Sequence, residues 1–310
     1  MLHIIIEKGV LAMQWVRKQS IDPEKNKLYR RAMIFTLGGN IILALAKALA
    51  AYFSGSVALF ADAANSISDV VYSFMMVWGL RVSQQPADIS HPQGHSRFEP
   101  IVGLLVTASM TLAGYQAAKA AISRMLAGGL AIDPGLPTLI LLAGAVIKLG
   151  MFYFIRNIGK KLNSPTLKTA AKDNLSDVST SGAAFLGVFL SSFIHPLLDP
   201  VAGILVSGWI FRNAFEAGKE NLAYLTGAGA TDEQRAEFVN IAKAVPGVSA
   251  VHHLMTEYVG PQLVLDMHIN VDGNLTLNQS HAIADQIIDA LEALPDVDRA
   301  YIHVEPDGWE

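Results

Sequence analysis

The feature that most constrains the fold of this sequence is a series of six long apolar segments. A helix that crosses a bilayer needs about 20 consecutive, mostly apolar residues. Segments of that kind lie at 32–53, 57–82, 99–124, 136–158, 166–193 and 198–219. Hydrophobic residues make up 52% of the 310 residues and charged residues only 16%, an apolar excess over an ordinary soluble domain. The sequence therefore predicts a membrane α-helical bundle with six transmembrane helices.

Basic residues alternate between the connections and so predict the orientation. They precede the first segment and occupy the second-to-third and fourth-to-fifth connections: Arg17, Lys18, Lys25, Lys27, Arg30, Arg31, Arg81, Arg97, Arg156, Lys160, Lys161 and Lys168. The connections at 54–56, 127–135 and 194–196 contain neither Lys nor Arg. Cytoplasmic loops carry the excess of basic residues. We therefore expect an integral protein of a plasma membrane, such as a bacterial inner membrane, with both termini in the cytoplasm.

After Gly218 the sequence changes to the pattern of a soluble domain. Thr231 followed by acidic residues is a typical helix N-cap, and Gly260-Pro261 separates two alternating, strand-like stretches. The expected elements are a helix at 231–244, strands at 250–259 and 262–271, a helix at 277–294 and a strand at 298–304. The order αββαβ predicts a small α+β domain with its helices on one face of the sheet.

Two apolar segments each carry a pair of polar, oxygen-bearing residues. Asn65 and Asp69 are four residues apart, as are Asp173 and Asp177, so each pair lies on one helix face. A carboxylate at membrane depth costs roughly 2.5–3.5 kcal/mol and needs a partner or a wet cavity. Hydrogen bonding between helices would explain a single Asn but explains three carboxylates poorly. The four oxygen-bearing side chains predict a site for a divalent cation, Mn²⁺ or Fe²⁺ ahead of Zn²⁺.

The same segments suggest exchange of the metal ion with protons. Carboxylates left without metal in a low-dielectric site would take up protons, which indicates metal/proton antiport. Asp62, one turn before Asn65, is expected to support the ligands or to line the pathway. Lys47 and Lys148 also lie within apolar segments, where a lysine either extends toward the membrane surface or pairs with an acid. We expect both to extend toward the surface.

Histidines form two further candidate sites. Asp88, His91 and His95 lie within eight residues in the second-to-third connection and supply three metal ligands, although loop histidines are usually only solvated. In the soluble domain the candidates are His252, His253, His268, His281, His303 and Glu305. The chain has no cysteine, which excludes thiolate sites, and its net charge of −4 argues against a nucleic-acid partner.

Four segments resemble the cation diffusion facilitator family: SVALFADAANSISD from Ser56, PADISHPQGHSRFE from Pro86, LDPVAG from Leu198 and VPGV from Val245. The resemblance implies a homodimeric exporter that moves divalent transition metals out of the cytoplasm against protons by alternating access, and not an enzyme. It implies a ferredoxin-like, metallochaperone-like cytoplasmic domain. We accordingly divide the chain into a cytoplasmic N-terminal segment (1–30), a transport domain (31–220) and a metal-binding dimerisation domain (221–310).

The resemblance also implies where metal binds. The transport site falls on Asn65, Asp69, Asp173 and Asp177, the loop site on Asp88, His91 and His95, and a binuclear cytoplasmic site on His252, His268, His281, His303 and Glu305. Zinc-transporting members usually have His or Asp at position 65 and His at position 173, so this chain is more similar to the manganese-handling branches. Glu305 replaces a common Asp. The linker from Thr226 to Gly229 lacks an acid, so a salt bridge from Arg97 to the linker is not expected.

Two other classes of protein are possible. A membrane metalloenzyme would use the acidic helical motifs for phosphoryl or prenyl transfer, but no nucleophile elbow, His-Glu-x-x-His motif or phosphate-binding Gly-rich loop is present. A membrane metal sensor without transport would depend on the histidine-rich domain. Such a sensor would have no use for intramembrane carboxylates, which are costly to insert.

Overall fold

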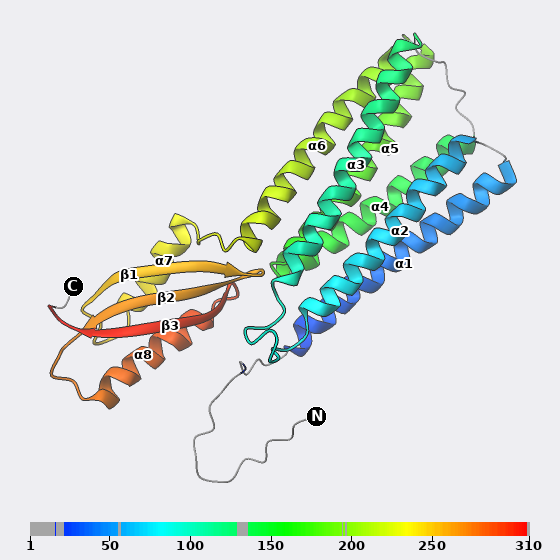
Figure 1. The fold of residues 1–310 in the computed structure, drawn as a ribbon. Coiled ribbons are helices and arrows are strands. Elements are labelled where there is room, and N and C mark those ends of the chain that lie inside the picture. Colours follow the sequence, from blue (N-terminus) through cyan, green and yellow to red (C-terminus); the bar gives the residue numbers. More distant parts are fainter. Residues whose placement is uncertain are drawn as a thin grey trace, which may run out of the picture.

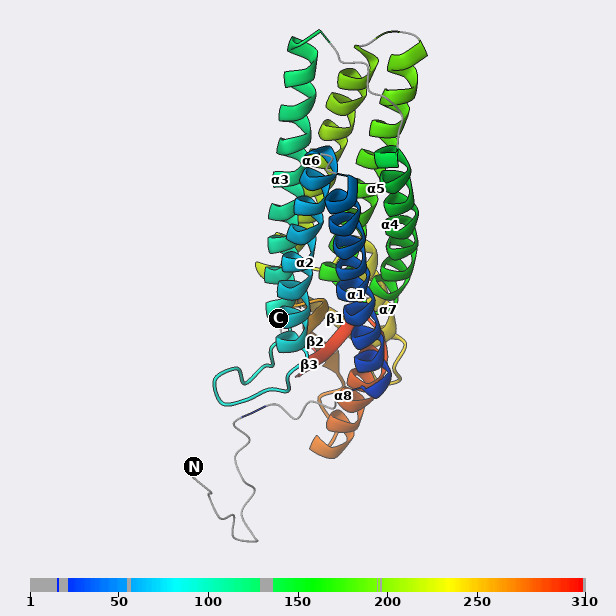
Figure 2. The same ribbon diagram turned by 90° about the vertical axis from the view of Figure 1, so that its right-hand side faces the viewer.

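The structure is a computed structural model that describes residues 22–54, 57–128, 136–193 and 197–308, together with Val16 and His195. The rest of the predicted N-terminal segment lies outside the described residues. Six long helices form a bundle, with a small α/β domain at one end of it (Figure 1, Figure 2). The helices are α1 (Pro23–Ser54), α2 (Val57–Ser83), α3 (Phe98–Leu126), α4 (Leu136–Lys161), α5 (Pro165–Phe193) and α6 (Leu198–Leu225).

The bundle is built from three closely packed pairs: α1 with α2, α3 with α6, and α4 with α5. Its interior includes Met76 and Leu80 of α2, Met151 and Ile155 of α4, and Leu167 of α5, all nearly or fully buried. Large apolar side chains also cover the outside of the bundle, among them Phe53, Trp78, Phe215, Leu205 and Val146. Apolar residues both inside and outside are typical of a bundle whose solvent is lipid.

Among the described residues, three helical segments are long and apolar enough to cross a membrane by themselves. They are Pro23–Ala50, Phe98–Leu126 and Leu142–Lys161. α1 begins at Pro23, ahead of the expected start near residue 32. Its first turns include Arg30 and Arg31 and lie at the end of the bundle next to the α/β domain (Figure 1).

A buried polar cluster connects three helices at the end of the bundle next to the α/β domain. Glu99, at the start of α3, accepts hydrogen bonds from Tyr29 Oη (3.0 Å) and from Ser164 Oγ, just before α5. Thr166 Oγ1 donates to the Glu99 backbone oxygen at 2.6 Å. All four residues are buried. The cluster therefore ties the starts of α3 and α5 to α1, a role of Glu99 that the sequence pattern did not reveal.

The small domain has the predicted αββαβ order. Its elements are α7 (Asp232–Lys243), β1 (Ala250–Val259), β2 (Gln262–Val271), α8 (Leu277–Glu292) and β3 (Val297–Pro306). The sheet order is β1-β2-β3, with β1 antiparallel and β3 parallel to β2. The hairpin at Gly260-Pro261 is confirmed. Thr231 and Thr276 each form a capping box at the start of α7 and α8.

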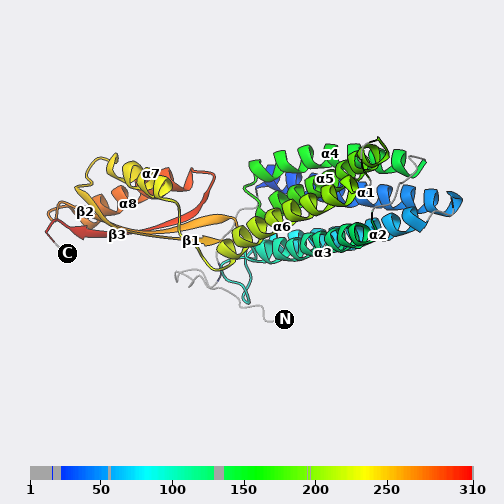
Figure 3. The same cartoon turned by 90° about the horizontal axis from the view of Figure 1, so that it is seen from above.

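The two faces of the sheet differ in character. Leu263, Leu265, Met267 and Ile269 alternate along β2 and are fully buried against α7 and α8 (Figure 3). The residues between them face the opposite side, which neither helix covers, and His268 is one of them. This uncovered face carries the candidate metal ligands of β1, β2 and β3.

A β-bulge places two consecutive histidines on the uncovered face. The pairing of β1 with β2 shifts between Val251 and His253, so that His252 has no direct partner across the ladder. Without the shift, neighbouring residues of a strand point to opposite faces. With it, both His252 and His253 are exposed beside His268.

Hydrogen bonds and one ion pair connect the domain to the bundle. Ser96 Oγ donates to the Val259 oxygen at 3.2 Å, and Asn163 Nδ2 donates to the Pro261 oxygen at 3.3 Å. Arg97 Nη2 lies 3.6 Å from Glu257 Oε1 of β1. Arg97 therefore pairs with the domain although the linker lacks an acid, because its partner comes from a strand.

Gly260 allows this close approach. Its φ is +69°, and a Cβ atom there would lie 2.5 Å from the Ser96 backbone oxygen. We predict that Gly260→Ala destabilises the contact between domain and bundle by about 1–3 kcal/mol, because strain and a backbone clash add together. The apparent melting temperature of the purified full chain measures this.

Gly308→Ala is the matched control for Gly260→Ala. Gly308 also has a positive φ, +87°, but a Cβ atom there meets nothing within 4 Å. The Gly308 variant should lose less stability than the Gly260 variant. Equal losses would show that the contact with Ser96 contributes nothing.

Candidate metal sites

Asp69 and Asp177 converge on one cationic side chain in the interior of the bundle. Lys148 of α4 places its Nζ 3.0 Å from Asp69 Oδ2 of α2 and 2.7 Å from Asp177 Oδ2 of α5. The lysine side chain is only 7% exposed, against 16% for Asp69 and 24% for Asp177. One ammonium group thus links α2 and α5 through the carboxylates that they carry. The expectation that Lys148 extends to the membrane surface was wrong.

Asp173 belongs to the same electrostatic cluster. It lies one turn before Asp177 on α5, and interacts through its charge with Asp69, Asp177 and Lys148. The side chains of Asn65 and Asp62, on the first turns of α2, lie outside the described residues. The structure therefore describes three of the four predicted transport ligands and brings these three together.

Neighbouring polar residues hold the backbone and side chains around this cluster. Asn40 Nδ2 of α1 donates to Ser73 Oγ at 2.7 Å, and Ser73 Oγ in turn donates to the Asp69 backbone oxygen at 2.7 Å. Both side chains are buried. Lys47 of α1 lies close to α4, since a Cβ atom on Gly144 would be 3.4 Å from its Cε atom. These contacts fix α1 against the two helices that supply Asp69 and Lys148.

The loop between α2 and α3 brings Asp88, His91 and His95 together as predicted. Their ligand atoms lie within 4.8 Å of one another. Asp88 Oδ1 is 3.5 Å from His91 Nδ1, and Asp88 Oδ2 is 3.6 Å from His95 Nε2. The His91 backbone N–H donates to Asp88 Oδ1 at 2.6 Å and lowers the pKa of that carboxyl from its ordinary value. An ionised carboxylate beside two imidazoles is a suitable donor set for a zinc-like divalent ion.

On the uncovered face of the sheet, Glu305 lies at the centre of three histidines. Its oxygens are 3.2 Å from His252 Nε2, 3.5 Å from His268 Nδ1 and 3.4 Å from His303 Nε2. The ligand atoms of His252, His268 and Glu305 lie within 4.8 Å of one another. Four of the five predicted ligands of this domain thus form one cluster.

The remaining predicted ligand lies elsewhere. His281 is on α8, at the helical side of the domain, and its Nε2 is 3.7 Å from Asp285 Oδ2. Within one chain the structure therefore does not bring His281 to Glu305. A second set, His253, Asp266 and His268, also has ligand atoms within 4.8 Å. Asp266 was not anticipated, although its place two residues before His268 puts both on one face of the strand.

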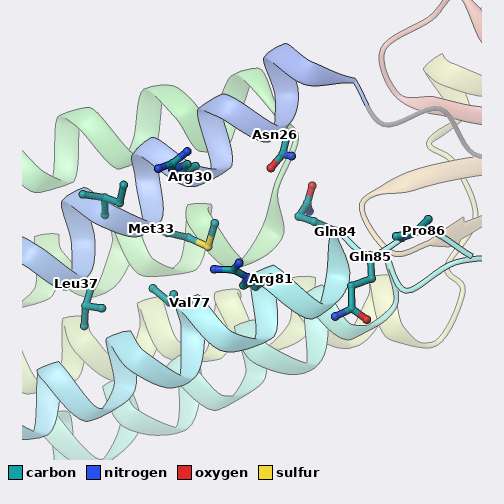
Figure 4. A pocket seen from close by; sticks show the side chains of 10 residues that line it. Asn26, Arg30, Met33, Leu37, Val77, Arg81, Gln84, Gln85 and Pro86 are labelled. Atoms are coloured by element: carbon teal, nitrogen blue, oxygen red, sulfur yellow. The ribbon is translucent and has the colours of Figure 1, made fainter.

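A cavity of about 700 Å³ lies between α1 and α2 (Figure 4). Asn26, Gln84 and Pro86 line it toward the α/β domain, and Leu37 and Val77 line it farther along the bundle. None of the described residues that line it belongs to the acidic cluster.

Both parts of the chain match known families. Residues 33–226 match the cation efflux transmembrane domain, and residues 230–307 match the cytoplasmic domain of cation efflux proteins. An uncharacterized transporter of Methanocaldococcus jannaschii is 31% identical over 275 residues, which cover 89% of this chain and 97% of the relative. The uncharacterized transporter YdbO of Bacillus subtilis is 31% identical, over 92% of this chain and 98% of its own length.

A further relative has an assigned metal. The manganese efflux system protein MneS of Bacillus subtilis is 27% identical over 88% of this chain and 94% of its own length. The fold and the family matches together define a membrane protein of metal-cation efflux. The chain belongs to the cation diffusion facilitator family, whose members are transporters and not enzymes. The predicted membrane bundle with a ferredoxin-like C-terminal domain is confirmed.

We predict that Glu305→Gln weakens metal binding by the full-length protein at its C-terminal domain by about tenfold or more, because three histidines share this carboxylate. Isothermal titration with Zn²⁺ and Mn²⁺ measures the affinity and stoichiometry. Glu237→Gln, an exposed change on α7, is the control and should leave both unchanged. Unchanged titrations for Glu305→Gln would contradict a metal site at this cluster.

Proposed function

We propose that the protein exports a divalent transition-metal cation from the cytoplasm in exchange for protons, with manganese favoured over zinc and ferrous iron. The observation that carries this proposal is the convergence of Asp69 and Asp177, from two helices, on one buried cation, the Lys148 ammonium. Carboxylates arranged to hold a cation in the bundle interior are the minimum requirement for moving one through it.

The donor atoms support the choice of ion. Asp69, Asp173 and Asp177 offer only oxygen, and Asn65 offers an amide oxygen on the same helix as Asp69. Oxygen donors suit manganese better than they suit ions that prefer nitrogen or sulfur. The relative MneS, named for manganese efflux, is consistent with this preference.

The other clusters have a supporting role in this proposal. Metal at Asp88, His91 and His95 would stabilise the loop that contacts the C-terminal domain through Ser96 and Arg97. Metal at the Glu305 cluster would stabilise the uncovered sheet face and a homodimer formed there. His281 would then serve another copy or another ion, since it lies apart from Glu305 within one chain.

Asp69→Ala or Asp177→Ala should reduce transport to the leak rate of protein-free liposomes. Each substitution removes a carboxylate that holds the cation in the bundle interior, and the remaining donors cannot replace the hydration shell of the ion. Initial rates of Mn²⁺ entry into proteoliposomes measure the effect. Asp289→Ala, an exposed change on α8, serves as the control. Rates like those of the unmodified protein in either variant would refute the transport site.

The ion and the coupling are tested by comparing uptake of Mn²⁺, Zn²⁺ and Fe²⁺ with and without an imposed proton gradient. We expect the gradient to accelerate uptake and Mn²⁺ to be taken up faster than Zn²⁺, because all described donors are oxygens. Equal or faster uptake of Zn²⁺ would show that ligand type does not set the selectivity. Absence of transport for all three ions would favour a metal sensor.

A further inference from the structure

Lys148 occupies the position that the transported ion needs. Its Nζ lies within 3.0 Å of Asp69 and 2.7 Å of Asp177. A transition metal bound by the same carboxylates would lie about 2.0–2.2 Å from their oxygens, in the same space between α2 and α5. A metal ion bound to the same carboxylate oxygens would overlap the position of the ammonium, and the two positive charges would repel each other. Binding of metal between these carboxylates therefore requires the ammonium group to withdraw.

We propose that Lys148 is a built-in competitor of the transported cation, which lowers the affinity of the site and thereby speeds release of the ion. The proposal rests on the transport site proposed above and assigns a role to a residue on a third helix. As the metal leaves, the ammonium returns to Asp69 and Asp177, so that neither carboxylate is left uncompensated. The flexible four-carbon stem of lysine suits such a short movement.

The charge balance of the cluster supports this role. Asp69, Asp173 and Asp177 against Lys148 leave two negative charges in excess when all are ionised. A divalent cation neutralises that excess while Lys148 remains nearby. Without Lys148 the cluster would hold a divalent ion with one negative charge left over. The ion would then be bound more tightly and released more slowly.

The burial of Lys148 excludes a role in which it merely covers apolar surface. Its ammonium group lies inside the bundle, 7% of the side chain is exposed, and both contacts are to proposed metal ligands. A lysine on the outside of the bundle offers the comparison. Lys119 of α3 is exposed, and removing its charge leaves the acidic cluster untouched.

The test compares Lys148→Met with Lys148→Arg and with Lys119→Met in the full-length protein. Mn²⁺ affinity is measured by titration in detergent, and KM and the maximal rate by uptake into proteoliposomes. We expect Lys148→Met to bind Mn²⁺ about tenfold tighter or more, with a lower KM and a lower maximal rate. Lys148→Arg keeps the charge and should stay near the unmodified affinity. Lys119→Met should match the unmodified protein.

A purely structural role for Lys148 would give the opposite pattern. If Lys148 only packs, its loss should raise KM or lower only the amount of active protein. An unchanged or weaker affinity of Lys148→Met for Mn²⁺ overturns the proposal. Lys148→Gln, which keeps polar N–H donors without the charge, repeats the test and should behave like Lys148→Met. If the unmodified protein transports no ion, the proposed function fails, and the titration in detergent still decides whether Lys148 competes with Mn²⁺.

Discussion

The arrangement of the bundle depends on a positive charge that neutralises carboxylates in a region with little water. An uncompensated Asp at membrane depth costs several kcal/mol, and two close together cost more because they repel. The ammonium of Lys148 reduces both costs, since it lies between Asp69 and Asp177. It also fixes the packing, because α4 must lie where its lysine reaches both α2 and α5. The observed packing of α4 against α5 and α1, and of α1 against α2, meets this requirement.

A continuous set of hydrogen bonds joins the helix that carries Asp173 and Asp177 to the C-terminal domain. Asn163, two residues before α5, donates to the Pro261 oxygen and to Asp296 Oδ1, both in the domain. The next residue, Ser164, donates to the buried Glu99 of α3. A shift of the domain relative to the bundle would therefore act directly on the start of α5. Through the contact of Ser96 with the Val259 oxygen, such a shift would also act on the start of α3.

Features set by local patterning were predictable from the sequence, and features that depend on three-dimensional neighbours were not. The hairpin at Gly260-Pro261 and the αββαβ order follow from turn residues and strand alternation, which operate over a few residues. The ion pair of Lys148 joins residues 79 positions apart, and no local pattern indicates it. Pairing of Lys148 with an acid was the less favoured of the two expectations, because an isolated lysine in an apolar helix usually extends to the membrane surface.

Two features of the C-terminal domain likewise could not be predicted from local sequence. Strict alternation would put His252 and His253 on opposite faces of the sheet, and only the bulge puts both on the uncovered one. No acidic partner for Arg97 was expected in the linker, because the segment from Thr226 to Gly229 has no acid. The fold instead brings Glu257 of β1 to Arg97, 3.6 Å away. The bulge comes from pairing between strands and the Arg97 contact from packing of the domain against the bundle, and no local stretch of sequence contains either.

A transport site differs from a storage site in that its affinity must stay low enough for release. Oxygen donors alone do not achieve this for a doubly charged ion, since three carboxylates in a medium of low dielectric would hold it too strongly. In the proposed transport site, the neutral amide of Asn65 in place of a fourth carboxylate would reduce the charge, and the proposed competition of the Lys148 ammonium for the same oxygens would reduce it further. On this argument Asn65 and Lys148 act in the same direction. Selectivity for a divalent ion at the proposed site would then depend on the charge that these two residues leave there, in addition to the identity of the ligand atoms.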